Sequence, residues 1–228
     1  RAVENREQIY GPEHPYTAFF LHNLASLYCD QGRYQEAEDL AARVLSIYEQ
    51  HLQADHHACA LPLQTLARLA YQQNRYVEAQ DLASRALALW EHHLPADHPG
   101  LGSVLHVKAA ICCAQGKERE AERLYQRALS VYRRSLGPHH LDLALLLDDL
   151  ATLRLRQGKW EEAKSLLQEA LCIWAHHQTL SHPAHAQCLD HYAQWLVNAH
   201  QEQDATEQVL RAQQIRMRRE TRAGATIW

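Results

Sequence analysis

The sequence repeats with a period of 42 residues, and this regularity limits the fold more than any other feature. Turn-like segments containing His at one place occur at 11–15, 53–57, 95–99, 137–141 and 179–183. No insertion interrupts this spacing. A fixed period of this length predicts an array in which each unit packs mainly against its neighbours.

A second signal inside each of the first four units divides it into two helices. It begins with Gln31-Gly32-Arg33-Tyr34, and the glycine position recurs as Asn74, Gly116 and Gly158. Gly and Asn are the residues that best adopt the left-handed conformation just past the end of a helix. Each unit is therefore predicted to contain a helix A that ends here and a helix B that follows.

The B segments carry the apolar stripe of an amphipathic helix. In the first unit the stripe comprises Ala37, Leu40, Ala41, Val44, Leu45 and Tyr48, and its last position recurs as Trp90, Tyr132 and Trp174. We interpret both tryptophans as core residues and not as a ligand cage. In the fifth unit the stripe decays to Ala205, Gln208, Val209, Ala212, Gln213 and Arg216, which predicts a solvent-facing cap.

The A segments open with Pro15, Pro99 and Pro183, a residue type that suits the first helical position. The preceding Asp or His is expected to cap the helix. Lys108 occupies a position that is Leu in other units. Its stem is expected to cover apolar surface while its amine reaches water.

Composition and motifs exclude several classes of protein. A net charge of −4 does not favour nucleic-acid binding, and no apolar run approaches the roughly 18 residues of a membrane span. No signal peptide is recognisable, so a cytoplasmic protein is expected. There is no Gly-rich phosphate loop, H-E-x-x-H or G-x-S-x-G motif. We therefore expect that the protein is not an enzyme and binds no cofactor.

The cysteines and histidines both have structural interpretations. The six cysteines show no C-x-x-C spacing and are read as reduced apolar residues. Many of the 17 histidines belong to the repeated turn or lie near the ends of B helices, so no metal site is predicted.

The repeated residues resemble a known family. Leu24-Ala25, Tyr28, the segment 31–34, Glu36-Ala37, Leu40 and His14-Pro15 are similar to the tetratricopeptide repeat (TPR) in its 42-residue, kinesin-light-chain-like form. The resemblance implies an all-α, right-handed superhelical α-solenoid of stacked antiparallel helix pairs. The expected divisions are the end of a preceding, truncated repeat at 1–10, repeats at 11–52, 53–94, 95–136 and 137–178, a C-terminal capping repeat at 179–222 and a tail at 223–228.

In this family the A helices line the concave groove that holds peptides. The resemblance assigns to this groove Phe19, His22, Asn23, Ser26, Asp30, Gln64, Thr65, Arg68, Gln72, His106, Asp148, Asp149, Thr152, Arg156, Asp190, His191, Gln194 and Asn198. Three aspartates in the C-terminal half suggest a partner segment with basic residues. A solvated acidic face is the alternative.

The function expected from the resemblance is a protein-interaction scaffold or adaptor that holds a peptide or protein segment. The alternative is a regulatory or ligand-sensing array of a larger signalling protein, with an effector domain such as a nucleotide-binding ATPase outside this sequence. Self-association through the C-terminal tail or the open N-terminal face is a further expectation. The basic last helix, with Arg211, Arg216, Arg218, Arg219 and Arg222, is interpreted as a solvated cap or as a contact for an anionic surface or another subunit.

Overall fold

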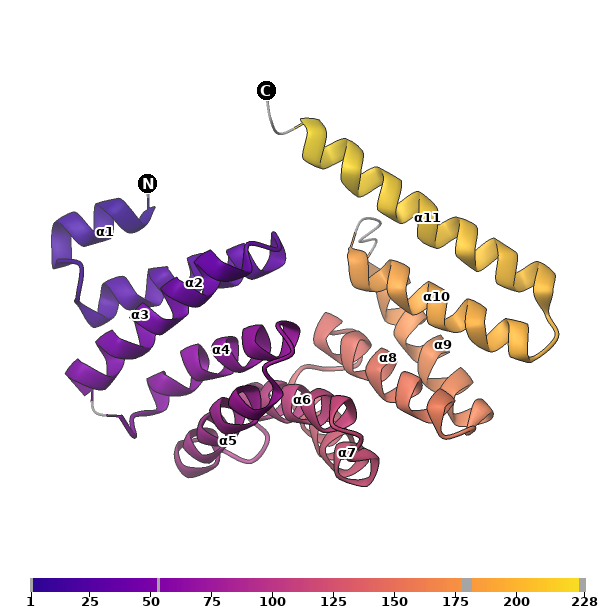
Figure 1. Ribbon diagram of the computed structural model, residues 1–228, viewed down its shortest axis with the longest axis horizontal. Helices are drawn as coiled ribbons and strands as arrows, with labels where there is room; N and C mark the ends of the chain where they lie inside the picture. Colours follow the sequence, from indigo (N-terminus) through magenta and orange to yellow (C-terminus); the bar gives the residue numbers. More distant parts are fainter. Residues whose placement is uncertain (1, 53, 178–181, 226–228) are drawn as a thin grey trace. The chain divides into compact units, whose positions relative to one another are not determined.

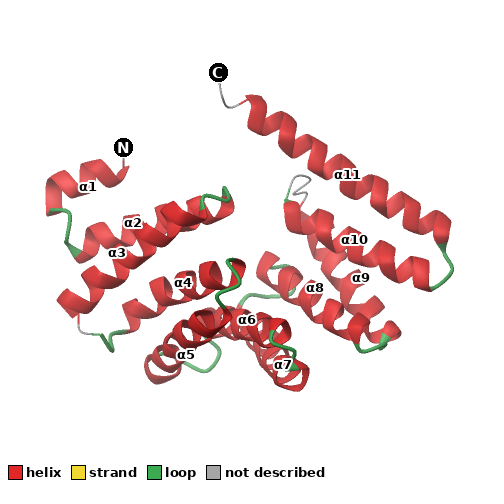
Figure 2. Cartoon of the chain, in the orientation of Figure 1, coloured by secondary structure: helices red, strands yellow, loops and turns green. Residues whose placement is uncertain are grey.

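The computed structural model describes residues 2–52, 54–177 and 182–225, and this part of the chain is helical without any strand (Figures 1 and 2). The helices are α1 (Ala2–Tyr10), α2 (Pro15–Asp30), α3 (Tyr34–Leu52), α4 (Ala60–Gln72), α5 (Tyr76–His93), α6 (Pro99–Ala114), α7 (Glu118–Ser135), α8 (Leu141–Arg156), α9 (Trp160–His177), α10 (Pro183–Asn198) and α11 (Glu202–Ala225). A short 3-10 helix, η1 (His57–Cys59), precedes α4. The all-α prediction is confirmed.

The chain forms two compact units, Arg1–Leu124 and Tyr125–Trp228, divided within α7. In unit 1, α2 packs on α3 and α4 packs on α5, while α3 contacts α4 and α5 contacts α6. In unit 2, α8 packs on α9 and α10 packs on α11, while α9 contacts α10. Each unit is thus a stack of helix pairs in which neighbours in sequence are neighbours in space.

The A helices end where the sequence predicts. Gly32, Gly116 and Gly158 have positive φ angles of 78°, 74° and 72°, and Asn74 has a φ of 61°. In the first repeat the amide of Arg33 donates to the carbonyl of Tyr28 at 2.9 Å, the six-to-one bond of a Schellman motif. In the fifth repeat His200 takes the left-handed position with a φ of 58°, although histidine at this position did not indicate a helix end.

The recurrent turn histidine caps each A segment. Nδ1 of His14, His56, His98, His140 and His182 accepts a hydrogen bond from the backbone amide two residues later, at 3.1 to 3.2 Å. An Nδ1 acceptor satisfies one of the amides that the first turn of a helix leaves unpaired. The predicted capping by histidine is confirmed, and it explains why His recurs at this place.

The predicted stripe of the B helices is largely correct. Trp90 and Trp174 are both buried, so their assignment to the core is confirmed. The stripe also includes a position that the pattern missed, three residues beyond Val44 and its equivalents, which holds the buried residues Ile47, Val131, Ile173 and Ile215. In α11 the predicted decay of the stripe is confirmed, because Gln213 and Arg216 are exposed. Val209 is exposed as well, and Ile215, which lies outside the predicted stripe, packs with Ala212, Ala186 and Leu189.

The structure also bears on the expectations for Lys108 and for the six cysteines. Lys108 is partly buried, and its Nζ donates to Ser84 Oγ at 3.1 Å, so the amine finds a hydroxyl partner on α5. The six cysteines, all within the described residues, are free thiols. Burial raises the pKa of Cys112 to about 11, which keeps its thiol protonated near neutral pH.

Helix α2 presents an open apolar face. Leu27 is 50% exposed, whereas Leu69 and Ile111, which follow it at intervals of 42 residues, are fully buried. Tyr10 and Tyr16 are also exposed, and their rings lie 5.2 Å apart. In α4 and α6 the corresponding face is covered by the preceding helix pair, whereas among the described residues only α1 precedes α2 (Figure 1).

Candidate peptide-binding faces on the A helices

In unit 1 the predicted groove residues of α2 and α4 form a partly apolar, solvent-accessible surface. Phe19 is 52% exposed and Leu61, at the equivalent position of α4, is 40% exposed. Asn23 on α2 and Arg68 on α4 are also exposed. This surface therefore combines apolar side chains with donors that can reach a peptide carbonyl.

His22 on α2 lies close enough to Arg68 on α4 for the arginine charge to affect its protonation. It is largely buried on α2, and burial, together with the nearby charge of Arg68, lowers the pKa of its imidazole. The ring is therefore neutral at physiological pH. Arg68 supplies the positive charge on this part of unit 1.

The remaining predicted residues of unit 1 differ in accessibility. Gln64 Nε2 donates to Ser103 Oγ on α6 at 2.6 Å, which ties adjacent A helices together. Thr65 is buried and is therefore part of the core. Ser26 and His106 are partly buried, and Gln72 is exposed. The side chain of Asp30 lies outside the described residues.

In unit 2 the equivalent faces of α8 and α10 carry a buried polar cluster. Asp148 is 6% exposed, and its Oδ1 lies 2.8 Å from His191 Nδ1. Thr152 Oγ1 lies 3.3 Å from the same nitrogen and donates to the Asp148 carbonyl at 3.0 Å. The hydrogen bond to Asp148 raises the pKa of His191, while burial raises the pKa of Asp148. The structure thus brings together three of the predicted site residues.

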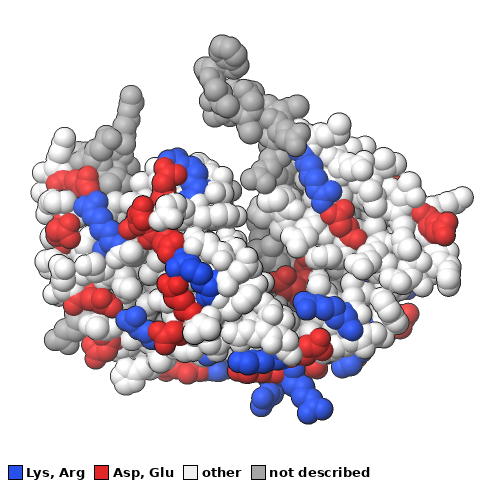
Figure 3. All heavy atoms as spheres, in the orientation of Figure 1, with Lys and Arg blue, Asp and Glu red and all other residues white. Residues whose placement is uncertain are grey.

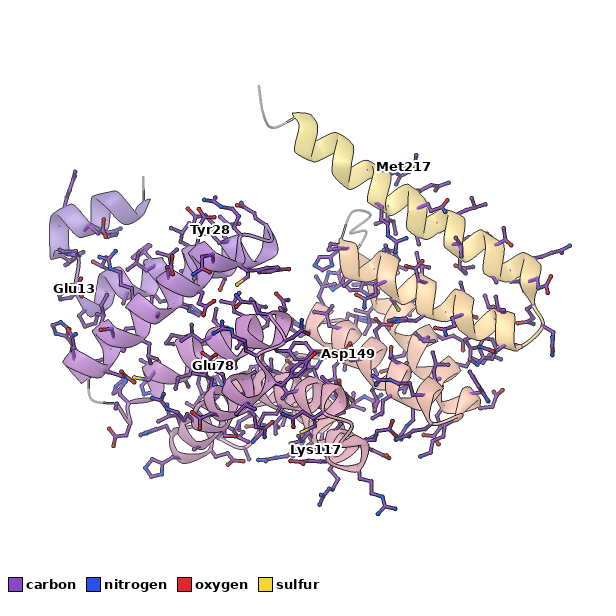
Figure 4. The ribbon with its side chains drawn as sticks, in the orientation of Figure 1. Glu13, Tyr28, Glu78, Lys117, Asp149 and Met217 are labelled. Carbon is purple, nitrogen blue, oxygen red and sulfur yellow. The ribbon has the colours of Figure 1, made fainter. Side chains whose placement is uncertain are left out.

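The other aspartates of unit 2 are closer to the surface. Asp190 on α10 forms an ion pair with Arg216 of α11, a partner that the sequence did not suggest. Asp149 is partly exposed on α8 (Figure 4). Arg156, Gln194 and Asn198 are exposed. Asp148 and Asp190, both counted as part of an acidic surface, therefore have intramolecular partners.

Among the described residues, no three or more His, Cys, Asp or Glu side chains are placed to hold a metal ion. Charged side chains of both signs are interspersed on the face drawn in Figure 3. None of the described helices combines the length and apolar character needed to cross a bilayer.

Comparison with known proteins gives a consistent family. The sequence profile of the tetratricopeptide repeat matches residues 1–50, 20–92 and 100–174. No curated protein sequence matches the chain significantly.

Solved structures extend the likeness over almost the whole chain. BtubC (BKLC) from P. vanneervenii is 21% identical with a TM-score of 0.71, and the match covers 99% of this chain and 89% of that one. A kinesin-light-chain-type protein from Podosopora anserina with nearly identical TPR-like repeats is 25% identical with a TM-score of 0.64, over 90% and 97% of the two chains. YrrB, a TPR protein with an unusual peptide-binding site, is 14% identical with a TM-score of 0.50, over 100% and 99%.

The profile match covers most of the sequence, and the helix pairs, turn histidines and left-handed helix ends recur at the same 42-residue spacing. The chain belongs to the tetratricopeptide repeat family, in its kinesin-light-chain-like form, and is a protein-interaction scaffold in the general sense of that family.

Proposed function

We propose that the chain binds an extended peptide segment of another protein on the exposed faces of its A helices. The observation that carries this proposal is the surface of unit 1, where Phe19 and Leu61 are exposed beside Asn23 and Arg68. Solvent-exposed aromatic and aliphatic side chains at equivalent positions of neighbouring helices offer apolar contacts to alternate residues of an extended peptide.

Polar groups on the same surface suit a peptide backbone. An exposed asparagine amide both donates and accepts hydrogen bonds, so Asn23 can pair with a peptide unit in either direction. Arg68 adds a charged donor, whose hydrogen bonds are stronger than neutral ones. The description of YrrB as a peptide-binding TPR protein supports this use of the fold, although its likeness to this chain concerns the fold alone.

A segment that lies on unit 2 is proposed to carry basic residues. Asp148 contributes little to this attraction, since it is buried against His191. Asp149 and Asp190 are more accessible than Asp148. Asp190 pairs with the half-exposed Arg216, and a lysine or arginine of the bound peptide can replace Arg216 in this ion pair. Asp149→Asn should therefore weaken binding of a lysine-containing peptide more than that of its glutamine counterpart.

We also propose that the open apolar face of α2 takes part in self-association. Leu27 and Tyr16 are each about half exposed, although Leu69, 42 residues beyond Leu27, is buried by stacking helices. A helix of a second copy would bury this face. Sedimentation velocity on wild-type chain and Leu27→Glu tests this proposal, and identical sedimentation over a wide concentration range would contradict it.

A random library of 12-residue peptides displayed on phage tests the principal proposal. We expect enriched peptides whose affinity falls about tenfold in Asn23→Ala/Arg68→Ala, because a charge-assisted and a neutral hydrogen bond are lost. The matched control, Arg119→Ala/Gln126→Ala, removes one arginine and one amide from exposed positions of helix α7. The proposal is wrong if every enriched peptide binds the groove variant as tightly as the wild type.

A further inference from the structure

Ion pairs between successive B helices join residues that are 36 positions apart. In unit 1, Arg43 Nη2 lies 3.0 Å from Glu7 Oε1, and Arg85 Nη2 lies 3.1 Å from Glu49 Oε1. In unit 2 the signs are exchanged, and Arg133 Nη2 lies 2.9 Å from both carboxylate oxygens of Glu169. Opposite charges at these two positions therefore occur in both units.

The next pair of positions, 175 and 211, breaks this pattern. Arg211 on α11 retains the basic residue, but the acidic position on α9 holds Ala175. Arg211 instead contacts residues of its own helix. Its Nη2 lies 2.6 Å from Glu207 Oε1, and its Nη1 lies 3.5 Å from Gln208 Oε1. The pair with Glu207 is more than half exposed on both sides, and such pairs contribute little free energy.

A cavity of about 540 Å³ lies beside Arg211 in unit 2. Leu171, Trp174 and Ala175 of α9, His185 and Leu189 of α10, and Ile215 of α11 supply its mainly apolar wall. Gln208, Arg211, Gln214 and Arg218 of α11 supply its polar side. This volume accommodates a large apolar side chain, and its basic side accommodates a neighbouring carboxylate.

Unit 1 contains a hollow on the corresponding face of α5, but the equivalents of the α9 and α10 wall do not line it. Arg85, Ala88, Leu89 and His92 of α5 occupy the positions of the α11 lining and border a cavity of about 550 Å³. There Arg85 is bound by Glu49, and Asp55 adds a second acidic group to the lining. Of these two cavities, the one in unit 2 combines an apolar wall with an arginine that lacks its inter-helix carboxylate.

From this comparison we infer that the cavity of α9, α10 and α11 is a second binding site, for an acidic peptide segment with a large apolar side chain. The apolar side chain packs against the wall formed by Leu171, Trp174 and Ile215. An adjacent glutamate or aspartate takes the place that a carboxylate at position 175 would fill and binds Arg211. The peptide gains apolar burial and a charge-assisted hydrogen bond together.

The inference is independent of the A-helix proposal, because the cavity does not include Asn23, Arg68 or any residue of α8. It also gives the basic surface of α11 a specific use. Helix α10 contributes to both sites with different residues, since His185 and Leu189 border the cavity whereas His191 contacts Asp148.

The test uses a fluorescein-labelled, end-blocked hexapeptide, Gly-Glu-Phe-Glu-Gly-Ser, in fluorescence anisotropy titrations with the full chain. We expect saturable binding that weakens about tenfold in Arg211→Gln, because the peptide carboxylate loses its charged partner. Ala175→Glu should weaken binding to a similar degree, because the new carboxylate occupies Arg211. Position 175 is exposed, so this substitution leaves the core intact.

Arg85→Gln is the matched control, since it removes the equivalent arginine of unit 1, and it should leave the affinity unchanged within about twofold. Peptides with Gln for both Glu residues, or with Ala for Phe, should each bind about tenfold more weakly. Absence of saturable binding up to millimolar concentration, or full affinity in Ala175→Glu, would overturn the inference. Equal affinity for free 3-phenylpropionate would show a small-carboxylate site and overturn the peptide assignment.

Discussion

Each unit places a histidine on the A-helix face, but the neighbouring charge has opposite sign in the two. In unit 1, burial and the charge of Arg68 lower the pKa of His22. In unit 2, the hydrogen bond to Asp148 raises the pKa of His191. Capping histidines, left-handed helix ends and the buried aromatic residues of the B helices are shared by the two units. The repeat thus conserves the scaffold within the chain, while the A-helix faces differ in charge.

The largest expected effect tests whether the two cores are equivalent. Trp90→Ala and Trp174→Ala should each destabilise the chain by about 3–5 kcal/mol, the usual cost of removing a large buried aromatic side chain. Both side chains are at most 5% exposed in the same structural position. Urea denaturation followed by circular dichroism measures the effect, with hydrogen exchange to locate it. A loss below about 1 kcal/mol in one variant would show that the cores are not equivalent.

The second prediction concerns the opposite charges of the two faces. His191→Gln should cost about 1–2 kcal/mol near pH 6, because a charge-assisted hydrogen bond to Asp148 is weakened. The raised pKa of His191 means that its contribution is full below the unfolded pKa of about 6.5 and is lost as pH rises through the folded value.

His22 should show the reverse dependence. Its lowered pKa means that its contribution is present above the unfolded pKa and is lost as pH falls through the folded value. As the pH falls from 8 to 5, the wild type should therefore gain stability relative to His191→Gln and lose stability relative to His22→Gln. NMR titration of the two imidazoles gives the pKa values directly, and shifts in the same direction would refute the comparison.

A smaller effect is expected at the helix caps, where the units should behave alike. His98→Ala and His140→Ala each remove an Nδ1 acceptor for a backbone amide. Each should cost about 1 kcal/mol, as other N-cap substitutions do. His98→Asn and His140→Asn keep a capping oxygen and should recover most of the stability. If the Asn variants were no more stable than the Ala variants, the caps would not be the reason for the repeated histidine.

The smallest expected effect concerns a local difference in the core. Lys108 donates to Ser84 Oγ in unit 1, whereas the equivalent position in unit 2 holds the buried Leu150. Lys108→Leu should stabilise the chain by about 0.5–1 kcal/mol, since apolar burial replaces a partly buried charge. Thermal unfolding of the variant measures this gain, and a lower melting temperature would indicate that the Ser84 contact outweighs apolar packing.

The sequence predicts the scaffold because each part of it depends on local residues. Gly32 and Asn74 mark helix ends, and His14 marks a helix start, so both boundaries can be recognised from the repeated residues. The stripe omitted one buried position of α11, held by Ile215, which packs with Ala186 and Leu189 of α10. That position could have been found from its recurrence as Ile47, Val131 and Ile173.

The site is less predictable because its charges depend on partners from other helices. Counting aspartates suggested an acidic surface, but His191 and Arg216 reach Asp148 and Asp190 from other helices. The loss of the inter-helix ion pair at Arg211 was also missed. Its signal is present in the sequence as Glu7 with Arg43 and Glu49 with Arg85, but it emerges only when residues 36 positions apart are compared.

Hydrogen-exchange mass spectrometry with a library-selected peptide tests most directly whether the A helices bind partners. If they do, amides of α2 and α4 should exchange more slowly in the complex, and Asn23→Ala/Arg68→Ala should abolish this protection. Protection confined to α3 and α5, or unchanged by the double substitution, would contradict the account.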